Sequence, residues 1–318
     1  MNSFPKNSRV ILYGGLGNQL FQLAAGIFAT QGKPLELESS LGDPRLGSQG
    51  GAALEDFVLP ANVIPLRRIK RSQISRKIFH YALMVSSFGR RSRLSRFVVA
   101  CAESIMNFAS VFTRNKDKFS LSDGTGFDPL LSPLTEPRVL IGCFQSYRWA
   151  FDVQVMSSLS SIKPRQVPKW LEELAEYAEL EMPIVVHIRR GDYAKVSELG
   201  FLTSDYYLRA IEILRLRHKN STVWVFSDDF DYCREILPQA ILATSRFVDY
   251  EQENAVGNLS AMRLGHAYVL SNSTFSWWGA FLSKSISPTV IYPSKWFLTH
   301  DAPLDLIPND WEELKVTS

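Results

Sequence analysis

The feature that most constrains this chain is a run of β-branched residues that ends abruptly in two guanidinium groups, a glycine and a carboxylate, in the sequence VVHIRRGDY from Val185 to Tyr193. A buried strand of a parallel sheet opens into a ligand-binding loop in this way. Arg189 and Arg190 are permanently charged and carry planar sets of donors that fit phosphate oxygens. The pair predicts a phosphate or diphosphate site. The alternative is a surface salt bridge with Asp192.

Length and charge restrict the class of protein. A chain of 318 residues suits two α/β domains better than one small core. With 46% hydrophobic and 21% charged residues, the composition is that of an ordinary globular protein. The net charge of +3 is too small to indicate a nucleic-acid partner.

The cysteines and the apolar segments bear on location. Cys101, Cys143 and Cys233 show no C-x-x-C spacing, so we expect buried reduced thiols and no zinc site. The first residues lack the pattern of a signal peptide. The most apolar stretch, Phe97 to Phe112, is interrupted by Glu103 and Asn107 and falls short of the roughly 20 apolar residues of a membrane span. These features predict a cytoplasmic protein.

The segment from Arg67 to Arg96 contains ten Arg and Lys residues and no acidic residue. Apolar residues between them predict amphipathic helices. A solvated basic face is one interpretation. The other is a basic face that rests on an acidic substrate or on an anionic membrane, which would place the protein at the periphery of the inner face of the membrane.

The N-terminal part opens with a strand, a loop and a helix. An apolar run, Val10 to Tyr13, precedes three glycines within the four residues Gly14 to Gly17, and apolar residues then recur at helical spacing. Such a loop lets a ligand approach the backbone, although a tight turn without a ligand fits equally well. The glycines do not form G-x-G-x-x-G, so a dinucleotide site has little support.

A proline-containing stretch, Ser160 to Pro168, is the best candidate for a linker. It divides the chain into an N-terminal α/β domain, residues 1–165, with the basic helical insertion, and a second Rossmann-like domain, residues 166–318. The C-terminal tail could pack back on the first domain.

Two further strands are followed by polar loops. Thr222 to Phe226 leads to Ser227, Asp228 and Asp229, and Ala267 to Leu270 leads to a helix start that is rich in hydroxyl and amide groups. The carboxyl ends of parallel strands share one edge of a sheet, so these loops and the arginine loop should converge on one pocket. Asp229-Phe230-Asp231 fits a helix cap, or less specifically a D-x-D metal site.

Three motifs, which follow one another along the chain in the order of the family, resemble the α-1,2-fucosyltransferase family: GGLGNQLFQ at Gly14, HIRRGDY at His187 and NSTFSWWGA at Asn272. Gln145-Ser146, Phe226 to Asp229, His266 and Tyr292 to Trp296 also match similar residues of that family. The chain departs from it at Asn258, where an acidic residue is expected, and at Gly265, where a cysteine is common. The resemblance implies two GT-B-like Rossmann domains facing a cleft, GDP-L-fucose as donor, inversion at the anomeric carbon, and no cofactor or required metal.

The resemblance also implies roles for individual residues. Arg189 would bind the β-phosphate, and the helix start at Ser273 to Ser276 would add donors. Asp192 is the candidate general base, with Glu198 in reserve or no base at all, so the catalytic residues are Arg189 and Asp192. The donor-binding residues would be Gly17, Asn18, His187, Arg189, Arg190, Ser227, Asp228, Asp229, Asn272, Ser273, Thr274 and Ser276.

The expected function is transfer of fucose to a hydroxyl of a glycan, in the first place O2 of a terminal galactose. Two alternatives stay open. One is a transferase of the same fold with another linkage or another GDP-sugar. The other is a non-catalytic glycan-binding module, which the arginine pair explains poorly.

Overall fold

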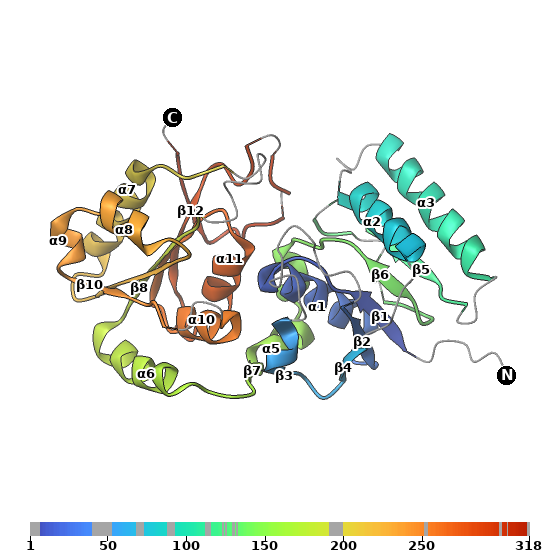
Figure 1. Ribbon diagram of the computed structural model, residues 1–318, viewed down its shortest axis with the longest axis horizontal. Helices are drawn as coiled ribbons and strands as arrows, with labels where there is room; N and C mark the ends of the chain where they lie inside the picture. The colour runs from blue at the N-terminus through green and yellow to red at the C-terminus, as the bar shows by residue number, and fades with distance from the viewer. Residues whose placement is uncertain are drawn as a thin grey trace. The chain divides into compact units, whose positions relative to one another are not determined.

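The chain, seen in a computed structural model, forms two compact units (Figure 1). The structure describes residues 7–39, 53–67, 73–87, 93–111, 116–122, 124, 126–128, 131, 133–190, 200–250, 254–298, 301–303 and 305–316. Unit 1 comprises Met1–Lys163 and Pro303–Ile307, and unit 2 comprises Pro164–Ala302 and Pro308–Ser318. The division falls two residues before the predicted boundary, and the short stretch Pro303–Ile307 groups with the first unit.

Unit 1 contains a parallel sheet of strand order β4-β2-β1-β6-β5. Its strands are short, and β1, β2, β5 and β6 are buried, as expected when both faces of a parallel sheet are covered. In β2 this burial includes Glu36 and Glu38, which pair with the equally buried Arg9 of β1. The strands are β1 (Ser8–Ile11), β2 (Leu35–Glu38), β4 (Val63–Arg67), β5 (Phe119–Leu121) and β6 (Val139–Ile141).

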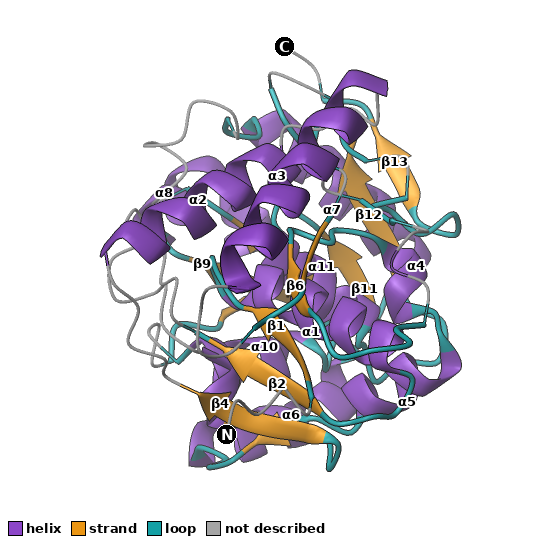
Figure 2. Ribbon diagram, turned by 90° about the vertical axis from the view of Figure 1, so that its right-hand side faces the viewer, coloured by secondary structure: helices purple, strands orange, loops and turns teal. Residues whose placement is uncertain are grey.

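Helices flank this sheet, and two of them form a pair. α2 (Gln73–Ser87) and α3 (Arg93–Val111) pack through Phe79, Leu83, Val99 and Met106 on side chains of β1, β5 and β6. Figure 2 shows the two helices side by side. A predicted helix within the basic segment is thus confirmed by α2, whereas α3 begins only at the end of that segment. The other elements are α1 (Leu16–Thr30), the 3-10 helix η2 (Ala53–Asp56), α4 (Tyr147–Ala150), α5 (Val153–Ser160) and the pair β3 (Phe57–Val58) and β7 (Lys163–Pro164).

Unit 2 contains a second parallel sheet, of strand order β10-β9-β8-β11-β12-β13. Numbered within the unit, this order is 3-2-1-4-5-6, the order of Rossmann sheets. The strands are β8 (Ile184–Ile188), β9 (Val223–Ser227), β10 (Ser245–Phe247), β11 (Ala267–Val269), β12 (Thr289–Pro293) and β13 (Glu312–Leu314).

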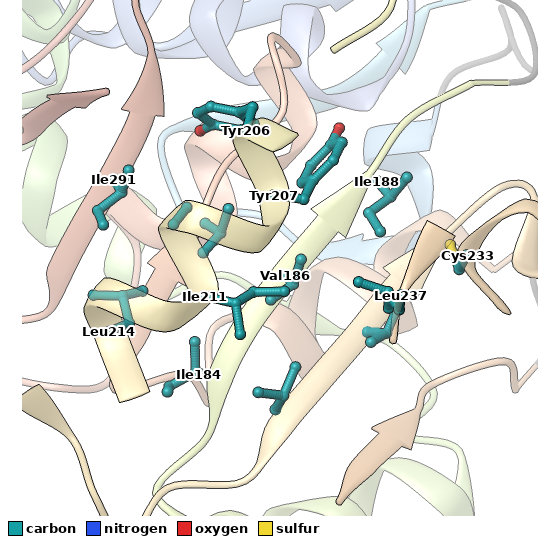
Figure 3. Close-up of a cluster of buried hydrophobic side chains, with 14 of the residues drawn as sticks. Ile184, Val186, Ile188, Tyr206, Tyr207, Ile211, Leu214, Cys233, Leu237 and Ile291 are labelled. Atoms are coloured by element: carbon teal, nitrogen blue, oxygen red, sulfur yellow. The ribbon is translucent and has the colours of Figure 1, made fainter. Parts of the chain in front are cut away.

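Helices cover both faces of this sheet. On one face, Tyr206, Ile211 and Leu214 of α7 (Ser204–Arg217) pack on Val186 and on other strand residues (Figure 3). On the other face, Leu171 and Leu174 of α6 (Lys169–Glu181) lie in a cluster that includes residues of α10 (Ala255–Met262) and α11 (Thr274–Phe281). α8 (Phe230–Ile236) and α9 (Gln239–Leu242) complete the unit.

The predicted fold class, α/β with two Rossmann-like units, is confirmed by these two parallel sheets. The cleft between the units stays a prediction. One expectation about the cysteines is wrong: Cys143 and Cys233 are buried, but Cys101 is exposed because it lies on the outer side of α3.

Candidate functional site

The strand order of unit 2 brings the three polar loops together. β8 pairs with β9 on one side and with β11 on the other, all in parallel. In this register Ile188 lies opposite Ser227. Arg189-Arg190 and Asp228-Asp229 therefore follow the ends of two adjacent strands at the same height in the sheet. The chain reverses its direction across the sheet between β8 and β11, and ligands of open α/β sheets bind at such a switch point. The prediction that the three loops lie at one edge of the sheet is confirmed, and a pocket lined by all three stays a prediction.

Asp228 connects both arginines. Its Oδ2 lies 3.2 Å from Nε of Arg189, and its Oδ1 accepts a hydrogen bond of 2.8 Å from the backbone N–H of Arg190. About a quarter of each side chain of the Arg189–Asp228 pair is exposed, 23% and 24%, so the guanidinium is both fixed and accessible. Arg189 thus pairs with an acidic residue of the loop after β9, and the alternative of a salt bridge with Asp192 falls outside the described residues.

The side chain of Arg190 contacts residues at the start of α8. Its guanidinium carbon lies 3.8 Å from the ring centroid of Tyr232, a cation–π distance, and its Nε lies 3.7 Å from a carboxylate oxygen of Asp229. Asp229 in turn caps α8, because its Oδ1 accepts the N–H of Tyr232 at 3.0 Å. The helix-cap interpretation of this acidic run is confirmed.

His187 links the central strand to the loop after β11. Its side chain is buried, and Nδ1 lies 2.7 Å from the hydroxyl oxygen of Ser271. Burial, and secondarily the charge of Arg189, lowers the pKa of His187 to about 3. The imidazole is therefore neutral at physiological pH and acts as a hydrogen-bonding group. Ser271 was not among the predicted site residues, although a serine directly after a strand was a usable signal.

The N-terminus of α11 follows β11. The hydroxyl of Ser273 accepts the N–H of Phe275 at 3.3 Å, and the hydroxyl of Ser276 donates to the carbonyl of Ser273 at 3.2 Å. The side chain of Asn272 donates to the carbonyl of Trp296, and Thr274 is the first residue of the helix. Trp277 and Trp278 are completely buried and belong to the core.

A hollow of about 370 Å³ lies beside the start of α8. Carboxylates dominate its lining, which suits the hydroxyl and N–H donors of a nucleoside better than phosphate oxygens. Among the residues that the structure describes, no group of three or more His, Cys, Asp or Glu side chains is arranged as a metal site. The hollow is lined by Asp228, Asp229, Phe230, Asp231, Arg234 and Asp249.

The glycine loop of unit 1 also lies at a switch point, between β1 and β6. Gly14 has φ of +75°, and a Cβ there would lie 2.7 Å from the side-chain nitrogen of Asn18. Gln145, which follows β6, donates to the side-chain oxygen of Asn18 at 3.0 Å. Gly17 and Asn18 lie in the first turn of α1. Their contact with the sugar-nucleotide donor stays a prediction. A larger hollow of unit 1, about 500 Å³, lies near α5 and includes none of these residues.

Some predicted residues fall outside the described part of the chain. The candidate base Asp192 and its reserve Glu198 are both in the range 191–199, which the structure does not describe. Tyr232 and Phe201, which flank the Arg190 guanidinium, were not predicted, because an aromatic residue in a sequence more often indicates core packing.

Comparisons with known proteins agree with the motifs. Residues 171–302 match the model of Glycosyl transferase family 11. An α-1,2-colitosyltransferase of Escherichia coli is 29% identical over 149 residues, which are 45% of this chain and 51% of that protein, so the match spans about half of the relative. A galactoside 2-α-L-fucosyltransferase of Caenorhabditis elegans is 23% identical over 304 residues, 89% of this chain and 71% of that protein.

Among solved structures, the fucosyltransferase NodZ from Bradyrhizobium gives a TM-score of 0.48 at 14% identity and covers 88% of this chain and 94% of its own. The resemblance to fucosyltransferases drawn from the sequence motifs is confirmed, and residues 171–302 of this chain match glycosyl transferase family 11.

Proposed function

We propose that this chain transfers L-fucose from GDP-L-fucose to a hydroxyl of a glycan acceptor, in the first place O2 of a terminal galactose, with inversion at the anomeric carbon. One observation carries the proposal. Arg189, which pairs with Asp228, directly follows the central strand β8 at the switch point of the sheet, and α11 begins after the neighbouring strand β11. The family match over residues 171–302 supports the class of reaction.

The diphosphate would lie between Arg189 and the N-terminus of α11. As the bond from the anomeric carbon to the β-phosphate oxygen breaks, its electron pair moves to GDP. The guanidinium and the N–H groups of the helix start would stabilise that growing negative charge. Ser273, Thr274 and Ser276 contribute their backbone or hydroxyl groups at this helix start.

The nucleoside would lie near Ser227, Asp228 and Asp229. Their oxygens accept hydrogen bonds from the ribose hydroxyls and from the N–H groups of guanine. His187 stays neutral and holds Ser271, so it positions the two loops that meet the donor.

The acceptor hydroxyl attacks the face of the sugar opposite the diphosphate. Its oxygen forms the new bond to the anomeric carbon, and its proton passes to Asp192, to Glu198 or to water. No step in this proposal uses a metal ion.

The test is incubation of the whole chain with GDP-L-fucose and a panel of galactose-terminated oligosaccharides, with and without EDTA. Release of GDP and linkage analysis of the product report donor, acceptor, regiochemistry and metal dependence together. Tight GDP binding without transfer to any acceptor would favour the glycan-binding module instead.

Replacement of Arg189 by Lys gives the sharpest prediction for the site. A point charge cannot replace the planar guanidinium at both the phosphate and Asp228, so kcat should fall by about 100-fold or more. Arg209→Lys, on α7 of the same unit, is the matched control and should keep its turnover. Near wild-type turnover of Arg189→Lys would show that the phosphate assignment is wrong.

The match to a colitosyltransferase favours a second candidate donor. Colitose is the 3-deoxy counterpart of L-fucose, and a site that hydrogen-bonds a sugar hydroxyl rejects the deoxy sugar strongly. Parallel assays with GDP-L-fucose, GDP-colitose and GDP-mannose separate these donors by their kcat/KM ratios.

A further inference from the structure

An apolar stripe runs along the outer side of α3. Leu94, Phe97, Val98, Ile105 and Phe108 are exposed to 72%, 67%, 41%, 69% and 71%. Their spacing of three, four and seven residues places them on one side of the helix, together with the exposed Cys101. Contiguous apolar patches of this kind mark interaction surfaces rather than ordinary solvated surface.

The opposite side of α3 already supplies the core contacts. Val99, Ala102 and Met106 are buried in the cluster that includes Phe119 and Leu121 of β5. α3 is therefore apolar on two sides, and the outer stripe is not needed for its packing on the sheet. The neighbouring α2 adds Ile78, Tyr81 and Met84, which are exposed to 47%, 58% and 49%.

The net charge of the sequence segment that contains the stripe indicates its partner. Residues 67–118 contain 13 Lys and Arg residues and only two acidic residues, Glu103 and Asp117, so this segment carries a net charge of +11. The whole chain carries +3, which leaves −8 for the rest. Among the described side chains, Lys77 and Arg96 are exposed on the two helices themselves.

We propose that the stripe of α3, with the neighbouring side of α2, docks on an anionic lipid surface. Apolar side chains would enter the boundary between headgroups and acyl chains, while the basic segment attracts anionic headgroups. Charge complementarity separates this partner from a second copy of the chain, because two segments of +11 would repel each other.

α3 lies along the membrane in this proposal and does not cross it. By length and composition alone, Leu94–Val111 is the one candidate span among the described helices. Two polar side chains nevertheless tie α3 to β5: Asn107 accepts the N–H of Phe119 at 2.6 Å, and Glu103 accepts the N–H of Leu121 at 3.0 Å. A spanning helix would have to break these bonds and carry Glu103 into the hydrocarbon.

The test uses the whole chain and sedimentation with vesicles. Vesicles of 70% phosphatidylcholine and 30% phosphatidylglycerol should bind the protein at low salt, and vesicles of pure phosphatidylcholine should bind it about tenfold more weakly. High salt should weaken binding to the anionic vesicles, because counterions screen the basic segment.

Ile105→Glu and Phe97→Ser remove apolar contact from the exposed stripe and should each lower the partition coefficient about tenfold. Leu216→Glu is the matched control: Leu216 lies on α7 of unit 2, and its exposure of 68% nearly equals the 69% of Ile105. Unchanged circular dichroism and thermal midpoints establish that the variants are folded.

Three results would overturn the proposal. The first is no sedimentation with anionic vesicles at low salt, or equal binding to neutral vesicles. The second is a stable dimer that Ile105→Glu dissociates, which would make the stripe an interface between copies. The third is bound protein that resists extraction with alkaline carbonate, which would indicate a spanning helix.

Discussion

At the scale of residues, Asp228 organises the arginine pair. One carboxylate oxygen faces the Arg189 side chain and the other accepts the Arg190 backbone N–H, so a single residue directly after β9 fixes both the direction of the Arg189 guanidinium and the backbone at Arg190. An accessible guanidinium held in one direction is pre-organised for phosphate oxygens and loses less conformational entropy on binding.

Asp228→Asn tests this positioning role. The amide oxygen can still accept the Arg190 N–H, but the ion pair with Arg189 is lost, so kcat/KM for the donor should fall about tenfold. Isothermal titration with GDP and with guanosine locates the effect. If Asp228 acts through Arg189, affinity for GDP falls while affinity for guanosine is kept; an equal loss for both would mean that Asp228 contacts the nucleoside. Glu235→Gln, an exposed residue of α8 that does not line the hollow, is the control.

His187 should make stability depend on pH. The pKa of His187 is about 3 in the folded chain because of burial and Arg189, against an ordinary value of 6.5. Above pH 6.5 neither state binds the proton; below it the unfolded chain binds a proton and the folded chain does not, so stability falls as pH falls towards 3. Between pH 6.5 and 5 the loss from this residue is roughly 2 kcal/mol.

The measurement is urea unfolding, followed by tryptophan fluorescence, of the wild type and of His187→Gln at both pH values. Glutamine keeps a polar group near Ser271 but does not titrate. The wild type should lose more stability than the variant over this interval, and equal losses would show that His187 is not the group responsible.

At the scale of elements, the start of α11 has both a structural and a proposed functional role. The Ser273 hydroxyl accepts the N–H of Phe275, which would otherwise be an unpaired donor of the first turn. The same turn is where the diphosphate is proposed to bind, so one substitution should change two measurable quantities.

Ser273→Ala should lower the free energy of unfolding by about 1 kcal/mol and raise KM for the GDP-sugar. Asp152→Ala is the matched control, because Asp152 caps α5 of unit 1 through the N–H groups of Gln154 and Val155. Asp152→Ala should lower the free energy of unfolding by a similar amount and leave KM for the GDP-sugar unchanged. An unchanged KM for Ser273→Ala would remove this hydroxyl from the proposed donor site.

At the scale of the whole molecule, the last residues of the chain belong to both units. Pro303–Ile307 groups with unit 1, and the following residues return to unit 2, where β13 pairs with β12. The stretch is held in unit 1 by Asp305: its carboxylate accepts the N–H of Phe127 and its carbonyl accepts the N–H of Tyr147, each at 2.9 Å.

Asp305→Ala should destabilise unit 1, although the residue lies near the C-terminus. Loss of the acceptor for a partly buried backbone N–H costs about 1–3 kcal/mol. Hydrogen exchange should become faster at Phe127, while amides of β8 in unit 2 keep their protection. Asp301→Ala, four residues earlier and counted with unit 2, should leave exchange at Phe127 unchanged.

Sequence by itself determined the elements whose signals are local. The runs of β8, β9 and β11 were predicted to within one residue at their ends. The order of polar loops after successive strands was enough to predict their convergence, because parallel strands place their carboxyl ends at one edge. Strands such as β10 and β13 were missed, since three residues carry too little pattern and depend on a neighbouring strand for their hydrogen bonds.

Only the tertiary structure decided which groups meet. The carboxylate beside Arg189 is Asp228, 39 residues further along the chain, because β8 and β9 are paired with Ile188 opposite Ser227. The neutral state of His187 and the outward stripe of α3 likewise depend on what packs around them. Periodicity specifies that a side chain lies on a given side of an element, whereas its partner and its exposure are set by the elements that fold against it.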